Sequence, residues 1–257
     1  MNSKTALITG GATGIGKKIA EELAQRGINL VVNYRSSENE AMNLTEGLIA
    51  KYGIRIELIQ GDISSQQDCI KICEYIKRKN ITIDILIHNA GPYIHERKKL
   101  TDYSIDEWNY LINGNLNAVF YLTKELLPKM REQKWGRVIT IGFDRVETAP
   151  GWVYRSAFAA AKTGLASLTR TLSLEEAENG ITANMVCPGD ITGHWKESNI
   201  LEAQSQVSTS IPVGRPGTGE DISRVVAFLV DDQSSFITGS IIPVTGGVDV
   251  LGKVHNK

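Results

Sequence analysis

Short apolar runs alternate with longer amphipathic segments along this 257-residue chain. Each run is too short for a helix, is rich in Ile and Val, and is apolar at consecutive positions. This pattern is typical of parallel strands that are covered on both faces of a sheet. Seven strands are therefore predicted, at residues 6–9, 30–33, 55–59, 83–87, 138–141, 182–186 and 241–244.

The segments between these runs have helical periodicity. Helices are predicted at residues 16–25, 38–52, 66–79, 105–133, 156–177 and 220–230. Regular alternation of strands and helices indicates right-handed crossovers and a doubly wound parallel sheet. Because the sequence has no repeat, linker or low-complexity tract, we expect one α/β domain over residues 1–257. Its predicted architecture is a Rossmann fold with a seven-stranded parallel sheet and helices on both faces.

Residues 190–219 interrupt the alternation. They contain more helix breakers than a simple crossover needs, namely Gly193, Pro212, Gly214, Pro216, Gly217 and Gly219. The segment follows the sixth predicted strand, at the carboxyl end of the sheet, where open α/β folds bind their ligands. We therefore predict a lid over the substrate.

Composition and charge argue against several classes of partner. The chain has 28 Lys and Arg against 29 Asp and Glu, so it lacks the excess of cations that binding to nucleic-acid phosphates requires. No apolar stretch reaches the roughly 18 residues that span a bilayer, and the first strand begins too early for a secretory signal to precede it. We expect a cytoplasmic protein without a nucleic-acid or membrane partner. Three cysteines, Cys69, Cys73 and Cys187, are interpreted as buried fillers, and no metal site is predicted.

A glycine-rich turn joins the first predicted strand to the first predicted helix. Gly10, Gly14 and Gly16 permit a tight turn, close approach to a pyrophosphate and close helix contact. The helix N-terminus adds free N–H groups and the positive end of its dipole. Glycine-rich turns also serve as simple connectors, but the place of this one in a βαβ unit favours dinucleotide binding.

The turn and several later motifs resemble the classical branch of the short-chain dehydrogenase/reductase family, and bacterial β-ketoacyl-acyl-carrier-protein reductases in particular. The glycine spacing is GxxxGxG, and residues 88–91 read HNAG where the family has NNAG. Further matches are Gly239 and the Gly246-Gly247 pair. The resemblance implies that the following residues contact the cofactor: Gly10, Thr13, Gly14, Ile15, Gly16, Arg35, Ser36, Asp62, Ile63, Asn89, Ala90, Gly91, Lys162, Pro188, Gly189 and Thr192.

Residues after the second predicted strand favour NADP(H) over NAD(H). An acidic side chain there would bind the ribose 2′-hydroxyl of NAD. The sequence instead has Arg35 and Ser36, with no acid before Glu38. A guanidinium pairs with a phosphate through two hydrogen bonds, and a serine hydroxyl donates another. NADP(H) is therefore the predicted cofactor.

The catalytic pattern that the resemblance implies is incomplete. The family uses Ser, Tyr, Lys and Asn, with the Tyr four residues before the Lys. Asn115 and Lys162 are present, but Phe158 stands at the Tyr position and Phe143 at the Ser position. Neither phenylalanine can give a proton to a developing alkoxide, and loss of a general acid costs typically 10²- to 10⁴-fold.

Tyr154 is the predicted replacement donor. It precedes Phe158 by four residues, so the two share a helix face if the helix extends that far. This arrangement resembles the displaced tyrosine of enoyl-acyl-carrier-protein reductases, although the spacing of eight to Lys162 is one longer than their commonest pattern. A packing role for Tyr154 beside Trp152 is the alternative. Other candidate donors lie in loops: Tyr93, His95, Asp144 and Arg145.

Two functions are consistent with these residues. The first is an NADPH-dependent oxidoreductase that transfers hydride to a carbonyl or activated enoyl group of a small molecule or acyl thioester. The second is a catalytically inactive NADP(H)-binding sensor or scaffold. Asn115, Thr192 and the full-length lid favour the enzyme, whereas Phe143 and Phe158 favour the binding protein. By resemblance, the long helices at residues 105–133 and 156–177 are expected to form a homotetramer or homodimer interface.

Overall fold

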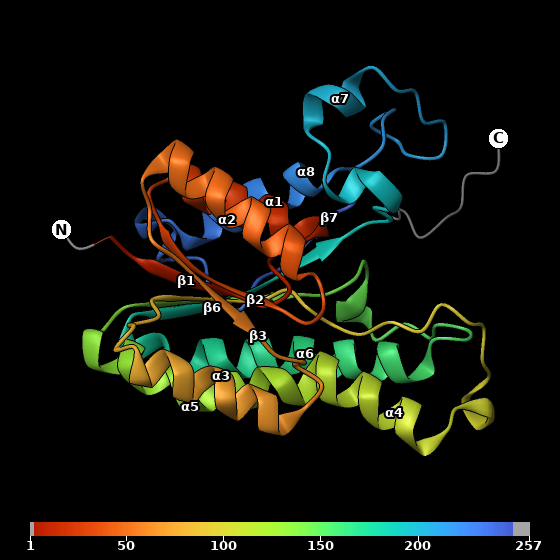
Figure 1. The fold of residues 1–257 in the computed structure, drawn as a ribbon. Coiled ribbons are helices and arrows are strands. Elements are labelled where there is room, and N and C mark those ends of the chain that lie inside the picture. The colour runs from red at the N-terminus through yellow and green to blue at the C-terminus, as the bar shows by residue number, and fades with distance from the viewer. Residues whose placement is uncertain (1–2, 249–257) are drawn as a thin grey trace.

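Seven parallel strands form the central sheet of the computed structural model, which describes residues 3–248 (Figure 1). Their order is β3-β2-β1-β4-β5-β6-β7, and every neighbouring pair is parallel. The strands are β1 Thr5–Ile8, β2 Asn29–Tyr34, β3 Ile56–Gln60, β4 Ile85–His88, β5 Gly136–Ile141, β6 Ile181–Pro188 and β7 Ile241–Val244. All seven predicted strands are present, and the strand order reverses between β1 and β4, where doubly wound sheets bind ligands.

Helices cover both faces of the sheet, as predicted (Figure 1). One face carries α1 Gly14–Gln25, α2 Glu38–Tyr52 and α8 Gly219–Val230. The other face carries α3 Gln66–Arg78, α5 Ala118–Gln133 and α6 Ser156–Glu175, with α4 Ile105–Ile112 beside them. This is the single-domain Rossmann fold that the alternating pattern predicts.

Two apolar layers, one on each face of the sheet, make up most of the core. Ala6 and Ile8 belong to the layer on the α1 side, whereas Leu7 belongs to the layer on the α3 side. All three side chains are fully buried. Burial on both faces explains why the strand runs are apolar at consecutive positions. The three cysteines are also buried and unpaired, and burial raises the pKa of each thiol to about 12.

The predicted helix at residues 105–133 is interrupted in its middle. The chain leaves α4 at Ile112, forms a π-helical segment over Asn113–Asn117, and continues as α5 from Ala118. The Asn115 side-chain amide donates to the carbonyls of Leu111, at 3.0 Å, and Pro92, at 2.8 Å. Because Leu111 lies four residues before Asn115, this side chain takes the carbonyl that a regular helix would give to a backbone N–H. Such π segments occur frequently at functional sites.

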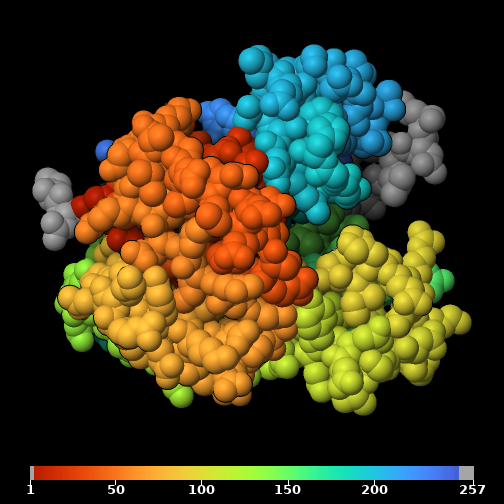
Figure 2. Space-filling model, viewed as in Figure 1, coloured from red at the N-terminus to blue at the C-terminus, as the bar shows by residue number. Residues whose placement is uncertain are grey.

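The predicted lid contains one short helix, α7 Ile200–Gln204, that the sequence pattern does not indicate. Short 3₁₀ turns occupy Leu100–Asp102, Val146–Thr148, Ala177–Asn179, Gly193–Lys196 and Asp232–Ser234. In the space-filling view the lid, drawn in cyan and blue, stands across a hollow from the yellow segment after β4 (Figure 2). Within residues 3–248, no helix combines the length and apolar character needed to cross a membrane.

Candidate functional site

The glycine-rich turn between β1 and α1 has the geometry that the sequence predicts. Gly10 and Gly14 have φ of +62° and +59°, a region that other residues rarely adopt. A Cβ atom on Gly16 would lie 2.1 Å from the carbonyl oxygen of Gly10 and 2.6 Å from Asn89 Nδ2. Asn89 also donates to the carbonyls of Thr9 and Gly10, at 3.0 and 3.2 Å. The turn is therefore tightly braced by the segment that follows β4.

Two adjoining cavities of about 450 and 310 Å³ open beside this turn, and Gly10, Arg35, Ala90 and Gly91 line both. Most of the predicted cofactor residues line one or both: Gly10, Thr13, Gly14, Ile15, Arg35, Ser36, Asp62, Ile63, Asn89, Ala90 and Gly91. The other predicted residues do not line them: Gly16, Lys162, Pro188, Gly189 and Thr192. Elements far apart in sequence thus bring the motifs of β1, β2, β3 and β4 together at one end of the sheet.

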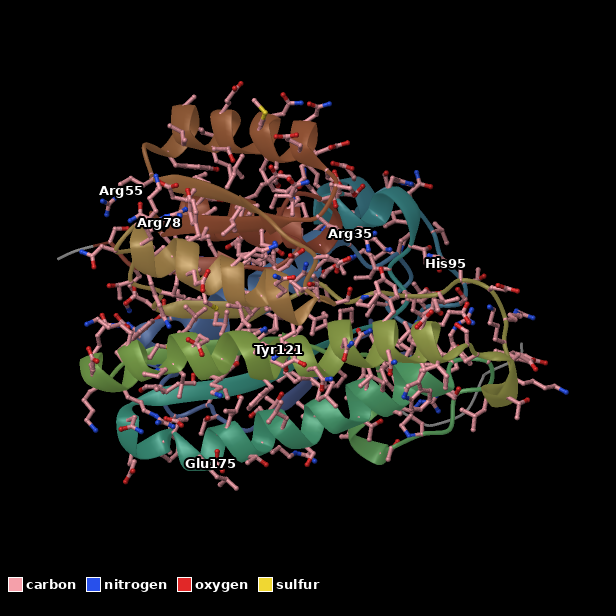
Figure 3. All side chains as sticks on the ribbon, turned by 60° about the horizontal axis from the view of Figure 1, so that its bottom comes forward. Arg35, Arg55, Arg78, His95, Tyr121 and Glu175 are labelled. Atoms are coloured by element: carbon pink, nitrogen blue, oxygen red, sulfur yellow. The ribbon has the colours of Figure 1, made fainter. Side chains whose placement is uncertain are left out.

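Arg35 lies just after β2, at the rim of both cavities. Its side chain is 59% exposed, its guanidinium donates to the Tyr110 hydroxyl, and Nη1 lies 3.7 Å from Asp62 Oδ2. An acid therefore does face Arg35, but it comes from the end of β3 rather than from the end of β2. Figure 3 shows Arg35 and His95 toward one end of the sheet, with Arg55 and Arg78 toward the other. The exposed guanidinium is suitably placed to bind a phosphate at the cavity rim.

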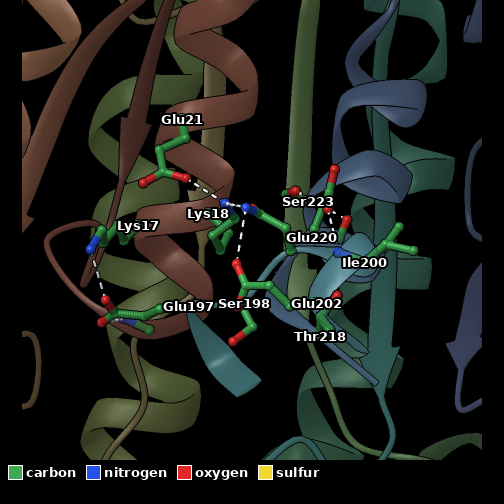
Figure 4. Close-up of polar contacts among 12 residues, drawn as sticks. Lys17, Lys18, Glu21, Glu197, Ser198, Ile200, Glu202, Thr218, Glu220 and Ser223 are labelled. Carbon is green, nitrogen blue, oxygen red and sulfur yellow. Dashed lines mark hydrogen bonds and ion pairs between the residues drawn. The ribbon is translucent and has the colours of Figure 1, made fainter. Parts of the chain in front are cut away.

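A carboxylate from the lid already lies at the N-terminus of α1 (Figure 4). Glu197 Oε1 accepts a hydrogen bond of 2.7 Å from Gly14 N, and Oε2 lies 2.8 Å from Lys17 Nζ. Burial acts to raise the pKa of Glu197, but the Gly14 N–H and Lys17 together bring it below its ordinary value. The N-terminus of α1 thus holds an anionic group in this structure, and the same N–H groups suit the pyrophosphate of a dinucleotide.

Lys162 and Asn115 meet around Gly91, behind the cavities. A Cβ atom on Gly91 would lie 2.3 Å from Asn115 Oδ1 and 3.3 Å from Lys162 Nζ. Lys162 is only 4% exposed, and its ammonium donates to the carbonyl of Ile141 at 2.7 Å. Asn115 Oδ1 is buried and accepts no hydrogen bond from the residues that the structure describes. The two predicted catalytic residues therefore share one small polar region in an otherwise apolar core.

Burial dominates the electrostatics of this region. It lowers the pKa of Lys162 from 10.5 to about 8, opposed in part by the nearby Cys187 thiol. Burial, together with the charge of Lys162, lowers the pKa of His88 to about 3. His88 is therefore neutral at physiological pH, and its Nε2 lies 3.2 Å from the Thr123 hydroxyl. Lys162 can accordingly change its charge in mildly alkaline solution.

The pKa of Lys162 predicts a pH-dependent contribution to stability. Since the pKa of Lys162 is lower in the folded protein, the unfolded chain binds the proton more tightly. The contribution of Lys162 to the free energy of unfolding therefore rises as the pH increases from about 8 toward 10.5. Between pH 8 and 10 we expect the free energy of unfolding to rise by ~2 kcal/mol relative to Lys162→Met. Urea unfolding of both proteins measures this difference, and the cysteine thiols, present in both, cancel. Parallel pH profiles would contradict the expectation.

An aromatic cluster covers the other side of Lys162. Phe158, four residues before Lys162 on α6, packs against Tyr93 and Trp152 with ring centroids 5.1 and 5.9 Å apart. Phe143, which follows β5, lies 5.0 Å from Trp152 and 6.2 Å from Phe158. Positions 143 and 158 therefore adjoin each other, as the family pattern implies, but neither carries a hydroxyl.

Tyr154 does not lie where the helical spacing predicts. Helix α6 begins at Ser156, and Tyr154 has φ of +66°, so it shares no helix face with Phe158. Its backbone carbonyl accepts a 3.1 Å hydrogen bond from the Tyr103 hydroxyl, and its side chain is exposed. Helix α6 begins only at Ser156 because a residue with a left-handed backbone, such as Tyr154, cannot be part of it. The catalytic role of Tyr154 remains a prediction, without the helical geometry that motivated it.

Arg155 is a site residue that the sequence does not single out. Its guanidinium donates to the Tyr93 hydroxyl at 2.5 Å and to the carbonyls of His95 and Glu96 at 3.0 and 2.9 Å. It thereby ties the loop after β4 to the start of α6. In sequence, an arginine beside a helix start is indistinguishable from a solvated surface arginine. The same holds for Glu197 in the lid.

Comparisons with known proteins agree with this geometry. Residues 10–249 match the family described as enoyl-(acyl carrier protein) reductase. The chain is 50% identical over 249 residues to "Putative oxidoreductase YtkK" of Bacillus subtilis (strain 168), covering 96% of this chain and 97% of that protein. It is 36% identical over 245 residues to the 3-oxoacyl-[acyl-carrier-protein] reductase FabG of Buchnera aphidicola subsp. Baizongia pistaciae (strain Bp), covering 95% and 97%. A solved blue fluorescent protein from a metagenomic library, in complex with NADPH, superposes with a TM-score of 0.82 at 30% identity, covering 96% and 98%.

Proposed function

Since the chain belongs to the short-chain dehydrogenase/reductase family, as an oxidoreductase related to 3-oxoacyl-[acyl-carrier-protein] reductases, we propose that it uses NADPH to reduce a carbonyl or activated enoyl group. The observation that carries the proposal is the assembly of the cofactor motifs around two adjoining cavities, with Lys162 and Asn115 directly behind Gly91. The proposed substrate is a small molecule or an acyl thioester.

The residues around the cavities have distinct proposed roles. Bound NADPH supplies the hydride. Arg35 binds the 2′-phosphate, Asp62 the adenine amino group, and the N-terminus of α1 the pyrophosphate. Lys162 donates to the hydroxyls of the nicotinamide ribose from its buried position. Asn115, through its unpaired Oδ1, holds a water molecule beside Lys162.

The missing hydroxyls at positions 143 and 158 make this an atypical member of the family. Reduction of a ketone places full negative charge on one oxygen as hydride arrives, and a proton donor is needed there. Reduction of an enoyl thioester passes through a delocalised enolate, which needs only a hydrogen bond to its oxygen. Phe143 and Phe158 therefore favour an activated alkene over an isolated ketone as the substrate.

The lid and the assembly state are part of the same proposal. Residues 190–219 close over the substrate, and Glu197 leaves Gly14 when the pyrophosphate takes its place. The active form is a homotetramer or homodimer.

The proposed preference for NADPH can be tested by binding measurements on the parent protein and two arginine variants. NADPH is expected to bind at least tenfold more tightly than NADH, because Arg35 forms a charge-assisted pair with the 2′-phosphate; tenfold corresponds to about 1.4 kcal/mol. Arg35→Ala should remove this preference and leave NADH affinity unchanged. Arg55→Ala, an exposed arginine toward the other end of the sheet, is the control and should change neither. Fluorescence titration measures all six dissociation constants, and equal affinities in the parent protein would refute the assignment.

A further inference from the structure

We infer that Tyr93, held by Arg155, gives the proton that the family's catalytic tyrosine would otherwise give. The inference rests on the proposed function and assigns a catalytic residue to it. Tyr93 lies in the loop after β4 and is one of the four loop residues that the sequence indicates as candidate donors.

The ring of Tyr93 lies between the cofactor cavities and the aromatic cluster. It lines the 310 Å³ cavity together with Gly91 and Asp62. Its edge meets the ring of Phe158, with centroids 5.1 Å apart and planes at 86°. Phe158 in turn lies 5.8 Å from Lys162 Nζ. Tyr93 thus places a phenol beside the ring that stands at the usual tyrosine position.

The hydroxyl of Tyr93 is oriented by Arg155 and keeps its own proton available. Arg155 Nε donates to Tyr93 Oη at 2.5 Å, and the guanidinium carbon lies 5.0 Å from the ring centroid. Among residues 3–248, no hydrogen bond uses the Tyr93 hydroxyl as a donor. Because Oη already accepts from a permanent cation, its O–H is left to donate to a substrate oxygen at the cavity.

Arg155 fixes the loop as well as the hydroxyl. Its hydrogen bonds to the carbonyls of His95 and Glu96 hold the chain that follows Tyr93. On the preceding side, Asn115 holds the carbonyl of Pro92. Tyr93 is therefore anchored from α6 and from the π-helical segment, as a donor with a defined position requires.

The proposed hydride and proton transfer needs no reactant besides the reduced cofactor, the substrate and solvent. Hydride from the reduced cofactor forms a C–H bond at the substrate carbon, and the π electrons of the carbonyl move to oxygen. The Tyr93 O–H bond breaks as its proton forms the new O–H bond of the alcohol. The phenolate is held by the Arg155 guanidinium and regains a proton from solvent. For an enoyl thioester, Tyr93 donates a hydrogen bond to the enolate oxygen, and the carbon is protonated later from solvent.

Tyr52 provides a matched control. Its phenol lies at the end of α2 and lines neither cavity. Tyr93→Phe is expected to lower single-turnover oxidation of NADPH by 10²-fold or more with an acetoacetyl thioester, whereas Tyr52→Phe should change it less than twofold. The dissociation constant for NADPH and the thermal midpoint of both variants should equal those of the parent.

Binding of the product supplies a readout that needs no turnover. A 3-hydroxybutyryl thioester should bind the cofactor-free Tyr93→Phe protein about threefold to tenfold more weakly than it binds the parent, since one hydrogen bond to the hydroxyl is lost. Arg155→Met should reduce the single-turnover rate with little change in substrate KM, and Arg155→Lys should restore part of it. If Arg155→Met does not fold, and Arg155→Lys does not restore the rate, the positioning role of Arg155 is overturned.

The outcomes separate this inference from the proposed function. Turnover that survives Tyr93→Phe, or that is lost instead in Tyr154→Phe, would overturn the inference and leave the reductase assignment intact. Absence of turnover in the parent with every substrate would overturn both. Loss confined to Tyr93→Phe, with unchanged NADPH affinity and weaker product binding, is the result expected.

Discussion

Replacing Phe158 by tyrosine in the Tyr93→Phe protein is expected to raise the rate of ketone reduction by about 10²-fold or more. The change supplies a general acid one helical turn before Lys162, and loss of such a group costs typically 10²- to 10⁴-fold. The ring of Phe158 already lies 5.8 Å from Lys162 Nζ, so a phenol at this position adjoins an ammonium that favours its ionised form. Steady-state oxidation of NADPH with an acetoacetyl thioester measures the gain.

Two further variants sharpen this experiment. Phe143 crowds the same region, so Phe143→Ser combined with Phe158→Tyr should exceed either single change, because serine adds a second donor to the oxygen. Phe228→Tyr, on the exposed face of α8, adds the same hydroxyl away from the site and should change nothing. A Tyr93→Phe protein that reduces the ketone as fast as the Tyr93→Phe, Phe158→Tyr double variant would show that the missing hydroxyl at position 158 is not limiting.

The second large effect is expected from Gly16→Ala. The new Cβ would lie 2.1 Å from the Gly10 carbonyl oxygen, which is backbone and cannot move without opening the turn. Overfilling a tight contact costs typically 1–3 kcal/mol and occasionally more, and this contact is unusually short. We expect the free energy of unfolding to fall by ~3 kcal/mol and the affinity for NADPH to be lost. Urea unfolding measures the first change, and fluorescence titration measures the second.

Gly47→Ala is the matched control for that experiment. Gly47 lies exposed inside α2, and a Cβ there would meet nothing within 4 Å. Alanine in an open helix interior stabilises a protein by roughly 0.5–1 kcal/mol relative to glycine. The two Gly→Ala changes should therefore have opposite signs. Equal, small effects would mean that the turn is not tightly constrained at Gly16.

Local patterns along the chain predict the sheet and most helices, because both depend on burial that repeats at short spacing. Ala6, Leu7 and Ile8 show this directly, since each faces an apolar layer. The break of the long helix at Asn113–Asn117 needs the side chain of Asn115 to reach Pro92, a contact between distant segments. The start of α6 at Ser156 depends on the left-handed backbone at Tyr154, which no sequence periodicity indicates.

The candidate site also has one part that local sequence patterns predict and one part that they do not. The glycine turn, Arg35 and Asp62 occupy fixed places after strands, so strand positions alone bring them to one cavity edge. The Arg155 side chain reaches from the residue before α6 to the loop after β4, and the Glu197 side chain reaches from the lid to α1. Such contacts depend on tertiary geometry, and short polar motifs do not encode them.

The central claim is that this chain transfers hydride from NADPH despite lacking the usual tyrosine and serine hydroxyls. Its most direct test is a single turnover of the parent protein with NADPH deuterated at the transferred position and a panel of crotonyl and acetoacetyl thioesters. We predict reduced product carrying one deuterium, formed faster from the enoyl thioester than from the ketone. NADPH that binds tightly and stays unoxidised with every thioester would contradict the claim and identify the chain as a binding protein.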